Sequence, residues 1–260
     1  MLDRNRHGSR GHAAGLGARD AAGGLRHCGR DVAGVVALAE GAPPQPAWST
    51  YVAVESADAV AARTRDAGGT VVVEPFDVLD VGRMTVLADP AGAVFCGWEA
   101  KAHPGARLVN EPGTWNWSDL HTTDPERAEA FYGAVLGWEA DGADLREGGY
   151  AMWRLPGYAD FLETIDPELR RRHAELGAPE GFSDAIGWML PMTSDRSAED
   201  PAAHWAVTFA VDDTDLVAGR AVELGGKIVA APVDLPPVRV AVLSDPQGAV
   251  FSVNTYQPDG

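Results

Sequence analysis

The chain has 260 residues, a hydrophobic content of 45% and a formal net charge of −17. The length suffices for two ordinary domains. No apolar run approaches the ~18 residues that a membrane span needs, and an acidic chain is a poor partner for nucleic acid, whose phosphates need a basic surface. We therefore expect neither a membrane nor a nucleic-acid partner. The two cysteines, Cys28 and Cys96, form no CxxC pattern, which favours a reducing, cytoplasmic setting.

The start of the chain differs from the rest. Residues 1–30 contain six arginines, two aspartates and seven glycines, with neither helical nor strand periodicity. Such a segment buries too little apolar surface to fold by itself, so we expect residues 1–28 to be poorly ordered. The next stretch, 29–38, has the composition of a single strand.

Two long segments are repeats of one another. Residues 47–75 align with residues 204–232, and "ADPAGAVFCGW" (88–98) aligns with "SDPQGAVFSVN" (244–254) after a one-residue gap. A self-match over about 50 residues indicates one supersecondary unit used twice.

Each repeat is predicted to fold as β-α-β-β-β. An alternating β-branched and aromatic strand comes first, followed by a helix that a Gly-Gly pair ends. A Val-rich strand, a third strand, an Asp-Pro-x-Gly turn and a last strand follow. The expected strands are 48–54, 70–73, 83–88 and 93–98 in the first copy, and 205–211, 228–230, 238–244 and 249–255 in the second.

A related unit precedes the second copy. The segment "TWNWSDLHTTDPERAEAFYGAVLGWEA" (114–140) predicts a strand and then a helix that begins after the N-cap Asp124 and ends at Gly137. Strands are expected at 138–141, 149–155 and 185–191. Between the last two, residues 166–177 predict a short exposed helix.

These features together resemble the vicinal oxygen chelate superfamily, which includes glyoxalase I, extradiol dioxygenases and bleomycin-binding proteins. The resemblance rests on paired βαβββ modules, the "FYGAVLGW" helix (131–138) and the "DPxGxxF" turn, and it covers about residues 29–256. The nearest likeness is to tandem glyoxalase-like proteins of actinobacterial type. The implied fold is α+β, with paired βαβββ modules in cup-shaped mixed sheets.

The resemblance implies a complete C-terminal glyoxalase-like domain at 108–260 and an incomplete N-terminal one at 29–100. A tandem protein of this type has four modules, and only three are found here. The first module is represented by 29–38 alone, so its absence would leave the inward face of module 47–100 without a cover. Residues 100–111 serve as the linker.

In metal-dependent members, His, Gln and Glu side chains on the first and last strands hold the ion. The corresponding positions here are Trp117, Ala206 and Ser252, with Ser49 and Cys96 in the N-terminal module. Divalent ions prefer carboxylate or imidazole ligands. We therefore expect no metal at the usual site and no cofactor.

What remains in the C-terminal cup is a set of aromatic and polar side chains, the usual composition of a small-molecule site. Alternation along the strands places the first-strand candidates on one face and leaves the inward face of the 149–155 strand undetermined. The candidate ligand-binding residues are Trp115, Trp117, Asp119, His121, Tyr150, Arg154, His204, Thr208, Ser252 and Asn254.

Three functions remain open. The first is metal-independent binding of a small organic molecule in the C-terminal cup. The second is a divergent enzyme, either a lyase or isomerase that uses Asp119 and His121 as an acid/base pair, or an oxygenase with unusual ligands. The third is an interaction module, in which the incomplete N-terminal half produces weak homo-oligomers.

Overall fold

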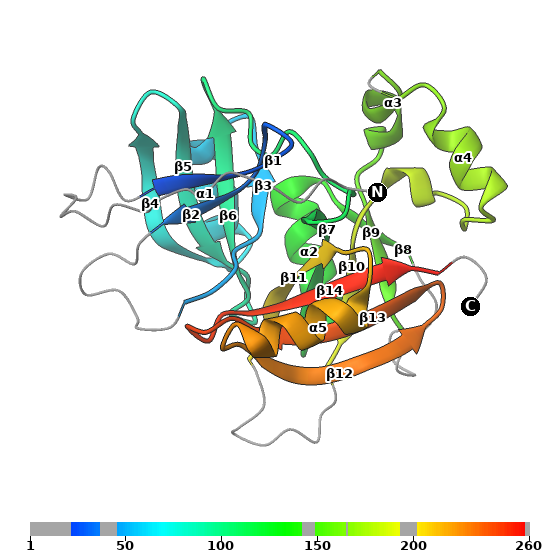
Figure 1. Ribbon diagram of the computed structural model, residues 1–260. Helices are drawn as coiled ribbons and strands as arrows, with labels where there is room; N and C mark the ends of the chain where they lie inside the picture. The colour runs from blue at the N-terminus through cyan, green and yellow to red at the C-terminus, as the bar shows by residue number, and fades with distance from the viewer. Residues whose placement is uncertain (1–21, 37–45, 142–148, 165, 193–201, 258–260) are drawn as a thin grey trace.

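The computed structural model describes residues 22–36, 46–141, 149–164, 166–192 and 202–257. It is an α+β fold with a four-stranded sheet, an eight-stranded sheet and a separate two-stranded hairpin. The four-stranded sheet and the eight-stranded sheet lie side by side (Figure 1).

The N-terminal module forms the four-stranded sheet, in the order β3-β6-β5-β4. Helix α1 begins after Ser56, whose side chain accepts a hydrogen bond from the Ala59 N–H. The elements are β3 (Tyr51–Ala53), α1 (Ala57–Asp66), β4 (Thr70–Val78), β5 (Gly82–Ala88) and β6 (Val94–Ala100). The predicted β-α-β-β-β order is confirmed.

The second and third modules share the eight-stranded sheet, in the order β12-β13-β14-β11-β7-β10-β9-β8. The second module contains β7 (Thr114–Thr122), α2 (Pro125–Leu136), β8 (Glu139–Asp141), β9 (Ala151–Arg154) and β10 (Ala185–Pro191). The third contains β11 (His204–Ala210), α5 (Thr214–Glu223), β12 (Lys227–Leu235), β13 (Val238–Ser244) and β14 (Val250–Tyr256). The two modules join where β7 pairs antiparallel with β11, from Thr114 opposite Ala210 to His121 opposite His204.

Helix α2 follows its sequence signals closely. The Asp124 carboxylate accepts a hydrogen bond from the Arg127 N–H at 3.1 Å, Pro125 occupies the first helical position, and Gly137 closes the helix with φ 73°. The insertion between β9 and β10 contains α3 (Tyr158–Glu163), α4 (Leu169–Glu175) and the 3₁₀ turn η2 (Phe182–Asp184). Helix α4, predicted as a short exposed helix, has no buried residue.

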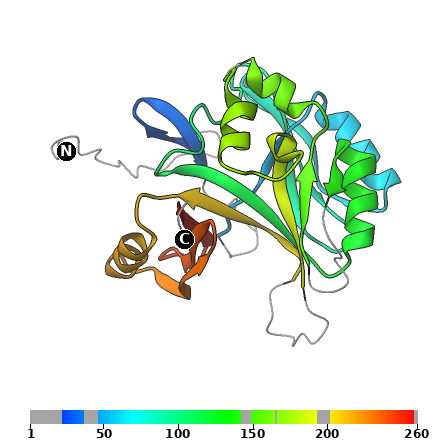
Figure 2. The same cartoon turned by 90° about the vertical axis from the view of Figure 1, so that its right-hand side faces the viewer.

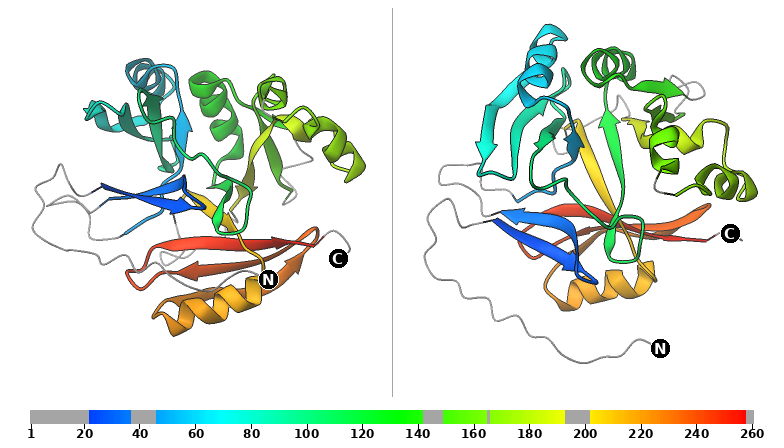
Figure 3. Two further views of the ribbon diagram at one scale, coloured as in Figure 1. Left: turned by 45° about the horizontal axis from the view of Figure 1, so that its top comes forward. Right: turned by 90° about the horizontal axis from the view of Figure 1, so that it is seen from above.

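One hydrophobic core joins the N-terminal module to the second module. Helices α1 and α2 lie against each other on one side of the molecule, and α5 lies on the other (Figures 2 and 3). Phe95 of β6 makes an edge-to-face contact with Phe131 of α2, and both are almost fully buried. The predicted boundary at 100–108 therefore separates two sheets but not two cores.

A buried chain of hydrogen bonds crosses the same junction. The Trp205 indole N–H donates to the Tyr132 hydroxyl at 2.9 Å, and that hydroxyl donates to the Asp89 carboxylate at 3.2 Å. The other oxygen of Asp89 accepts from the backbone N–H groups of Ala91 and Ala93. All three modules thus meet at Tyr132, whose side chain is fully buried.

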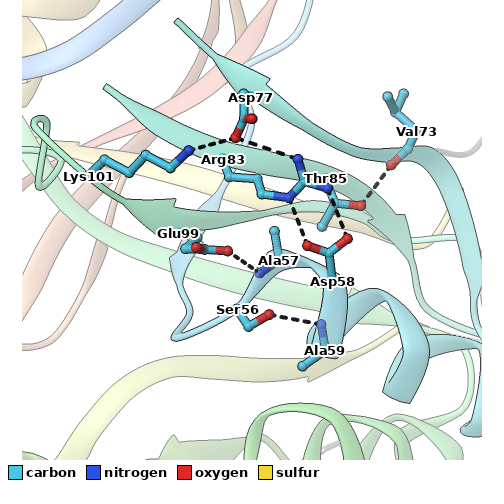
Figure 4. Close-up of polar contacts among 10 residues, drawn as sticks. All are labelled: Ser56, Ala57, Asp58, Ala59, Val73, Asp77, Arg83, Thr85, Glu99 and Lys101. Carbon is cyan, nitrogen blue, oxygen red and sulfur yellow. Dashed lines mark hydrogen bonds and ion pairs between the residues drawn. The ribbon is translucent and has the colours of Figure 1, made fainter. Parts of the chain in front are cut away.

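Each repeat also contains the same ion-pair clamp between its helix and its sheet. In the N-terminal module, Arg83 of β5 binds both carboxylate oxygens of Asp58 and lies 3.5 Å from Asp77, which also pairs with Lys101 (Figure 4). In the last module, Arg239 binds both oxygens of Asp215 and one of Asp234. Equivalent residues of the repeat therefore make equivalent contacts.

The start of the described chain forms a hairpin. Strand β1 (Ala22–His27) pairs antiparallel with β2 (Arg30–Val36), and the predicted strand at 29–38 corresponds to β2. Residues 22–27 are thus a strand, where the sequence predicted poor order up to residue 28; residues 1–21 lie outside the described chain. The expected uncovered face of the N-terminal sheet is partly open, since Tyr51 is 51% exposed while Cys96 is buried.

Among the described helices, none is long and apolar enough to cross a membrane.

Candidate functional site

The cup is the face of the eight-stranded sheet that points away from the helices. Leu120 of β7 is fully buried in the helix-side core, so its neighbours Asp119 and His121 point to the opposite face, as does Trp117. The structure therefore brings these three predicted residues together along one strand of the cup.

A bulge separates Trp115 from this group. The β7–β11 register shifts between Thr208, which lies opposite Trp117, and Phe209, which lies opposite Trp115. The Trp115 indole N–H donates to the hydroxyl of the buried Ser118, on the helix side of the sheet. Trp115 is thus not on the face where strict alternation placed it.

The bulge turns Asn116 toward the last module instead. The Asn254 amide of β14 donates to the Asn116 side-chain oxygen at 2.9 Å. Ser252, two residues before Asn254, lies opposite Thr208 of β11 in a parallel pair. These residues form the polar side of the cup, and Asn116 is a member that the sequence analysis missed because a bulge is not visible in the alternation.

Two further aromatic side chains were also missed, and both lie against Trp117. Phe182, from the turn η2 in the insertion, stacks on Trp117 with ring centroids 6.3 Å apart and planes 9° apart. Trp188 of β10 is tilted against Trp117 at 6.2 Å. The predicted strand at 185–191 is confirmed. Trp188 could have been predicted from it, because Met189 is buried on the helix side and its neighbour must point to the cup. Alternation could not predict Phe182, because this residue lies in the insertion and not in a strand.

Asp119 lies beside this aromatic group. Its backbone pairs with Trp188, and its Oδ1 atom is shielded from solvent and makes no hydrogen bond. Burial raises the pKa of Asp119 to about 7, against smaller lowering effects of the Trp188 backbone N–H and the Trp117 indole. The Trp117 indole N–H is near the carboxylate but outside hydrogen-bonding geometry, so it also has no partner.

The β9 strand closes one end of the cup. Trp153 is fully buried against Tyr132 and Trp138 on the helix side, which places Tyr150 and Arg154 on the cup side. Tyr150 is 59% exposed and contacts the Trp188 ring edge-on at 5.3 Å. Arg154 pairs with Asp141 at 3.2 Å. The burial of Trp153 thus identifies the inward face of this strand, which the sequence left open.

His121 and His204 form the opposite end. Their rings are stacked, with centroids 4.8 Å apart and planes 3° apart. Burial, together with the neighbouring His204, lowers the pKa of His121 to about 4. Each of the ten predicted residues except Trp115 thus belongs to a strand face or rim of one cup.

A pocket of about 260 Å³ lies behind Phe182, between that ring and α4. His173 of α4 contacts Phe182 edge-on at 5.1 Å and makes a hydrogen bond with Ser183 at 2.9 Å. The Phe182 ring therefore separates this pocket from Trp117 and the cup.

Comparisons with known proteins identify the family to which this chain belongs. A family model described as a glyoxalase-like domain matches residues 117–254, which contain Trp117, Asp119 and most of the cup. Protein CFP32 of Mycobacterium tuberculosis, whose name assigns it provisionally to the glyoxylases, is 38% identical over 228 residues, which are 86% of this chain and 76% of that protein. The chain belongs to the glyoxalase-like family of the vicinal oxygen chelate superfamily.

Other proteins similar to this chain have different names. The anthracycline biosynthesis protein DnrV of Streptomyces peucetius is 38% identical over 206 residues, covering 79% of this chain and 64% of DnrV. The Mn(II)-bound glyoxalase of Novosphingobium aromaticivorans is 17% identical, with a TM-score of 0.48, over 81% of this chain and 64% of that one. The chain thus spans just under two thirds of each of these two proteins.

The metal positions of the superfamily can now be tested against the cup. The resemblance assigns these positions to Trp117, Ala206 and Ser252, and none of the three offers a carboxylate or an imidazole. In the described ranges, no three His, Cys, Asp or Glu side chains gather in a metal-binding group. The residues at these positions do not fit the superfamily's divalent ion.

Proposed function

We propose that the C-terminal cup binds a small, flat organic molecule without the superfamily's usual metal site. The observation that carries this proposal is the composition of the cup centre. The Trp117 ring stands where metal-dependent members have a ligand, with Phe182 and Trp188 against it. Aromatic walls with a few placed polar groups are typical of small-molecule sites.

The polar groups support a ligand that forms hydrogen bonds. Asp119 Oδ1, Trp117 Nε1 and Arg154 Nε are all shielded from solvent and have no partner. Buried polar atoms without partners are costly, and a bound molecule that supplies the missing hydrogen bonds removes that cost. A molecule that offers an acceptor to the indole and a donor to the carboxylate would satisfy two of them together.

The test is a thermal-shift screen of aromatic compounds followed by calorimetric titration of the hits. Because one relative is named for anthracycline biosynthesis, the set includes an anthracycline. Trp117→Ala should weaken binding by about 1–3 kcal/mol while the domain stays folded, since a stacking wall is lost. The matched control is Trp115→Phe, which changes the other face of the same strand.

Equal weakening by both variants would contradict the proposal, because a general disturbance of β7 would then explain the loss. Global unfolding of Trp117→Ala would mark Trp117 as core. Stoichiometric metal in mildly purified protein that is needed for ligand binding would overturn the metal-independent part.

A second function is favoured by one feature of the same cup. The Asp119 carboxylate has an unpartnered oxygen beside the aromatic group, where it could move a proton on a bound molecule. A divergent isomerase or lyase would then exchange a substrate hydrogen with solvent. Deuterium incorporation into a screening hit by the wild type and not by Asp119→Asn would support this alternative over binding alone.

A further inference from the structure

Two histidines stand at the rim of the cup, away from the superfamily's metal positions. His121 is four residues after Trp117 on β7, and His204 is two residues before Ala206 on β11. They are direct cross-strand partners, and both point to the cup face because their neighbours Leu120 and Trp205 are in the helix-side core.

The hydrogen bonding of His204 assigns its proton. Its Nδ1 lies 2.7 Å from the backbone carbonyl oxygen of Ala202. A carbonyl oxygen can only accept, so Nδ1 carries the proton and Nε2 keeps its lone pair. Histidines that bind metals in proteins are commonly oriented by this kind of bond from the other ring nitrogen.

His121 supplies a second imidazole directly opposite His204 on the neighbouring strand. Its ring is stacked parallel to that of His204, with centroids 4.8 Å apart, so one ring must turn before the in-plane lone pairs of both can meet at one ion. The His121 ring is the one that can turn, because neither of its nitrogens has a hydrogen bond within the described chain. Both side chains are only partly buried, so an ion from solvent can approach them.

We propose that His121 and His204 together bind a divalent late transition-metal ion of the zinc class at the rim of the cup. Imidazole nitrogen is a preferred ligand for zinc, nickel and copper. Because no third His, Cys, Asp or Glu joins the pair in the residues described, water or a ligand oxygen completes the coordination sphere. This site goes beyond the proposed function, which does not need it.

The test is calorimetric titration of untagged, chelator-treated full-length protein with Zn²⁺ alone. The wild type should bind about one Zn²⁺ per chain at the rim. His121→Gln and His204→Gln should each weaken that binding at least about tenfold, because one imidazole cannot chelate. The matched control, His103→Gln, lies in the loop after β6 and should bind like the wild type.

A second measurement needs no variant. Substoichiometric Ni²⁺, which is paramagnetic, should broaden the ring NMR signals of His121 and His204 before those of His103 and His173. Earlier broadening of the other two, retention of wild-type zinc affinity by both glutamine variants, or no zinc binding at millimolar concentration would each overturn the proposal. None of these results depends on an organic ligand, so failure here leaves the proposed cup function intact.

Discussion

The N-terminal module (47–100) and the last module (203–256) are copies of one sequence, yet they have different neighbours. In the last module, seven-residue β11 pairs with β7 on one side and β14 on the other. In the N-terminal module, β3 has three residues, and within the described chain it pairs only with β6. The same sequence pattern makes a full strand only where a second edge supplies hydrogen bonds.

Burial beneath the helix differs in the other direction, because it is greater in the N-terminal module than in the last module. Helix α1 packs on α2, so Leu87 and Phe95 beneath it are fully buried in a core shared with the second module. Helix α5 covers a smaller separate core, and its Leu216 is 70% exposed. The comparison teaches that the module's internal contacts are inherited with its sequence, whereas burial depends on what lies beside the module.

The largest expected difference concerns the two equivalent phenylalanines. Phe95→Ala should destabilise the protein by about 3–5 kcal/mol, because a filled core position becomes a cavity. Phe251→Ala should have a smaller effect, because Phe251 is only partly buried, at the edge of the smaller core. Urea unfolding monitored by circular dichroism measures both, and equal losses would show that the two environments are equivalent after all.

The turn aspartates give the next contrast. Asp89 and Asp245 both accept hydrogen bonds from their own turn, but only Asp89 also accepts from Tyr132. Asp89→Ala should therefore be more destabilising than Asp245→Ala by about 1–3 kcal/mol, since the buried Tyr132 hydroxyl loses its acceptor. The comparison fails if the two alanine variants unfold at the same urea concentration.

Asp89 should also make stability depend on pH. Burial raises the pKa of Asp89 above its ordinary value of 3.8, so the folded protein holds this proton more tightly than the unfolded chain does. This contribution to stability is therefore present at low pH and is lost as the pH rises through the folded pKa. Unfolding free energies measured upward from about pH 3 should show this decline in the wild type and not in Asp89→Asn.

The equivalent tryptophans should differ less. Trp205→Phe loses the hydrogen bond to Tyr132 and should cost about 1 kcal/mol. Trp48→Phe keeps the edge-on aromatic contacts with Phe209 and Phe251 and removes an indole N–H that has no partner. Thermal unfolding should place Trp48→Phe near the wild type and Trp205→Phe below it; the reverse order would contradict this account.

The smallest effects are expected at the repeated clamp. Asp58→Asn and Asp215→Asn each break a two-point contact with an arginine at the exposed end of a helix. Exposed ion pairs contribute little and are screened by salt. The two variants should shift the urea midpoint slightly and equally, with the shift fading at high salt; a large shift in one module alone would show that the clamps are not equivalent.

The sequence by itself determined the elements of each module. Asp124 and Gly137 bound α2 as expected, and the repeat predicted the β-α-β-β-β order, because capping, turn chemistry and alternation act over a few neighbouring residues. The strand face that carries Trp117, Asp119 and His121 followed from the same short-range alternation.

Tertiary structure decided the rest. Three features depend on contacts between residues far apart in the chain. They are the bulge that puts Asn116 in the cup in place of Trp115, the packing of Phe182 from the insertion against Trp117, and the core shared across the predicted linker. The equivalent turns of Asp89 and Asp245 show the reason. Local sequence sets which hydrogen bonds a residue can make, but only the packing of a neighbouring module decides which of them are buried.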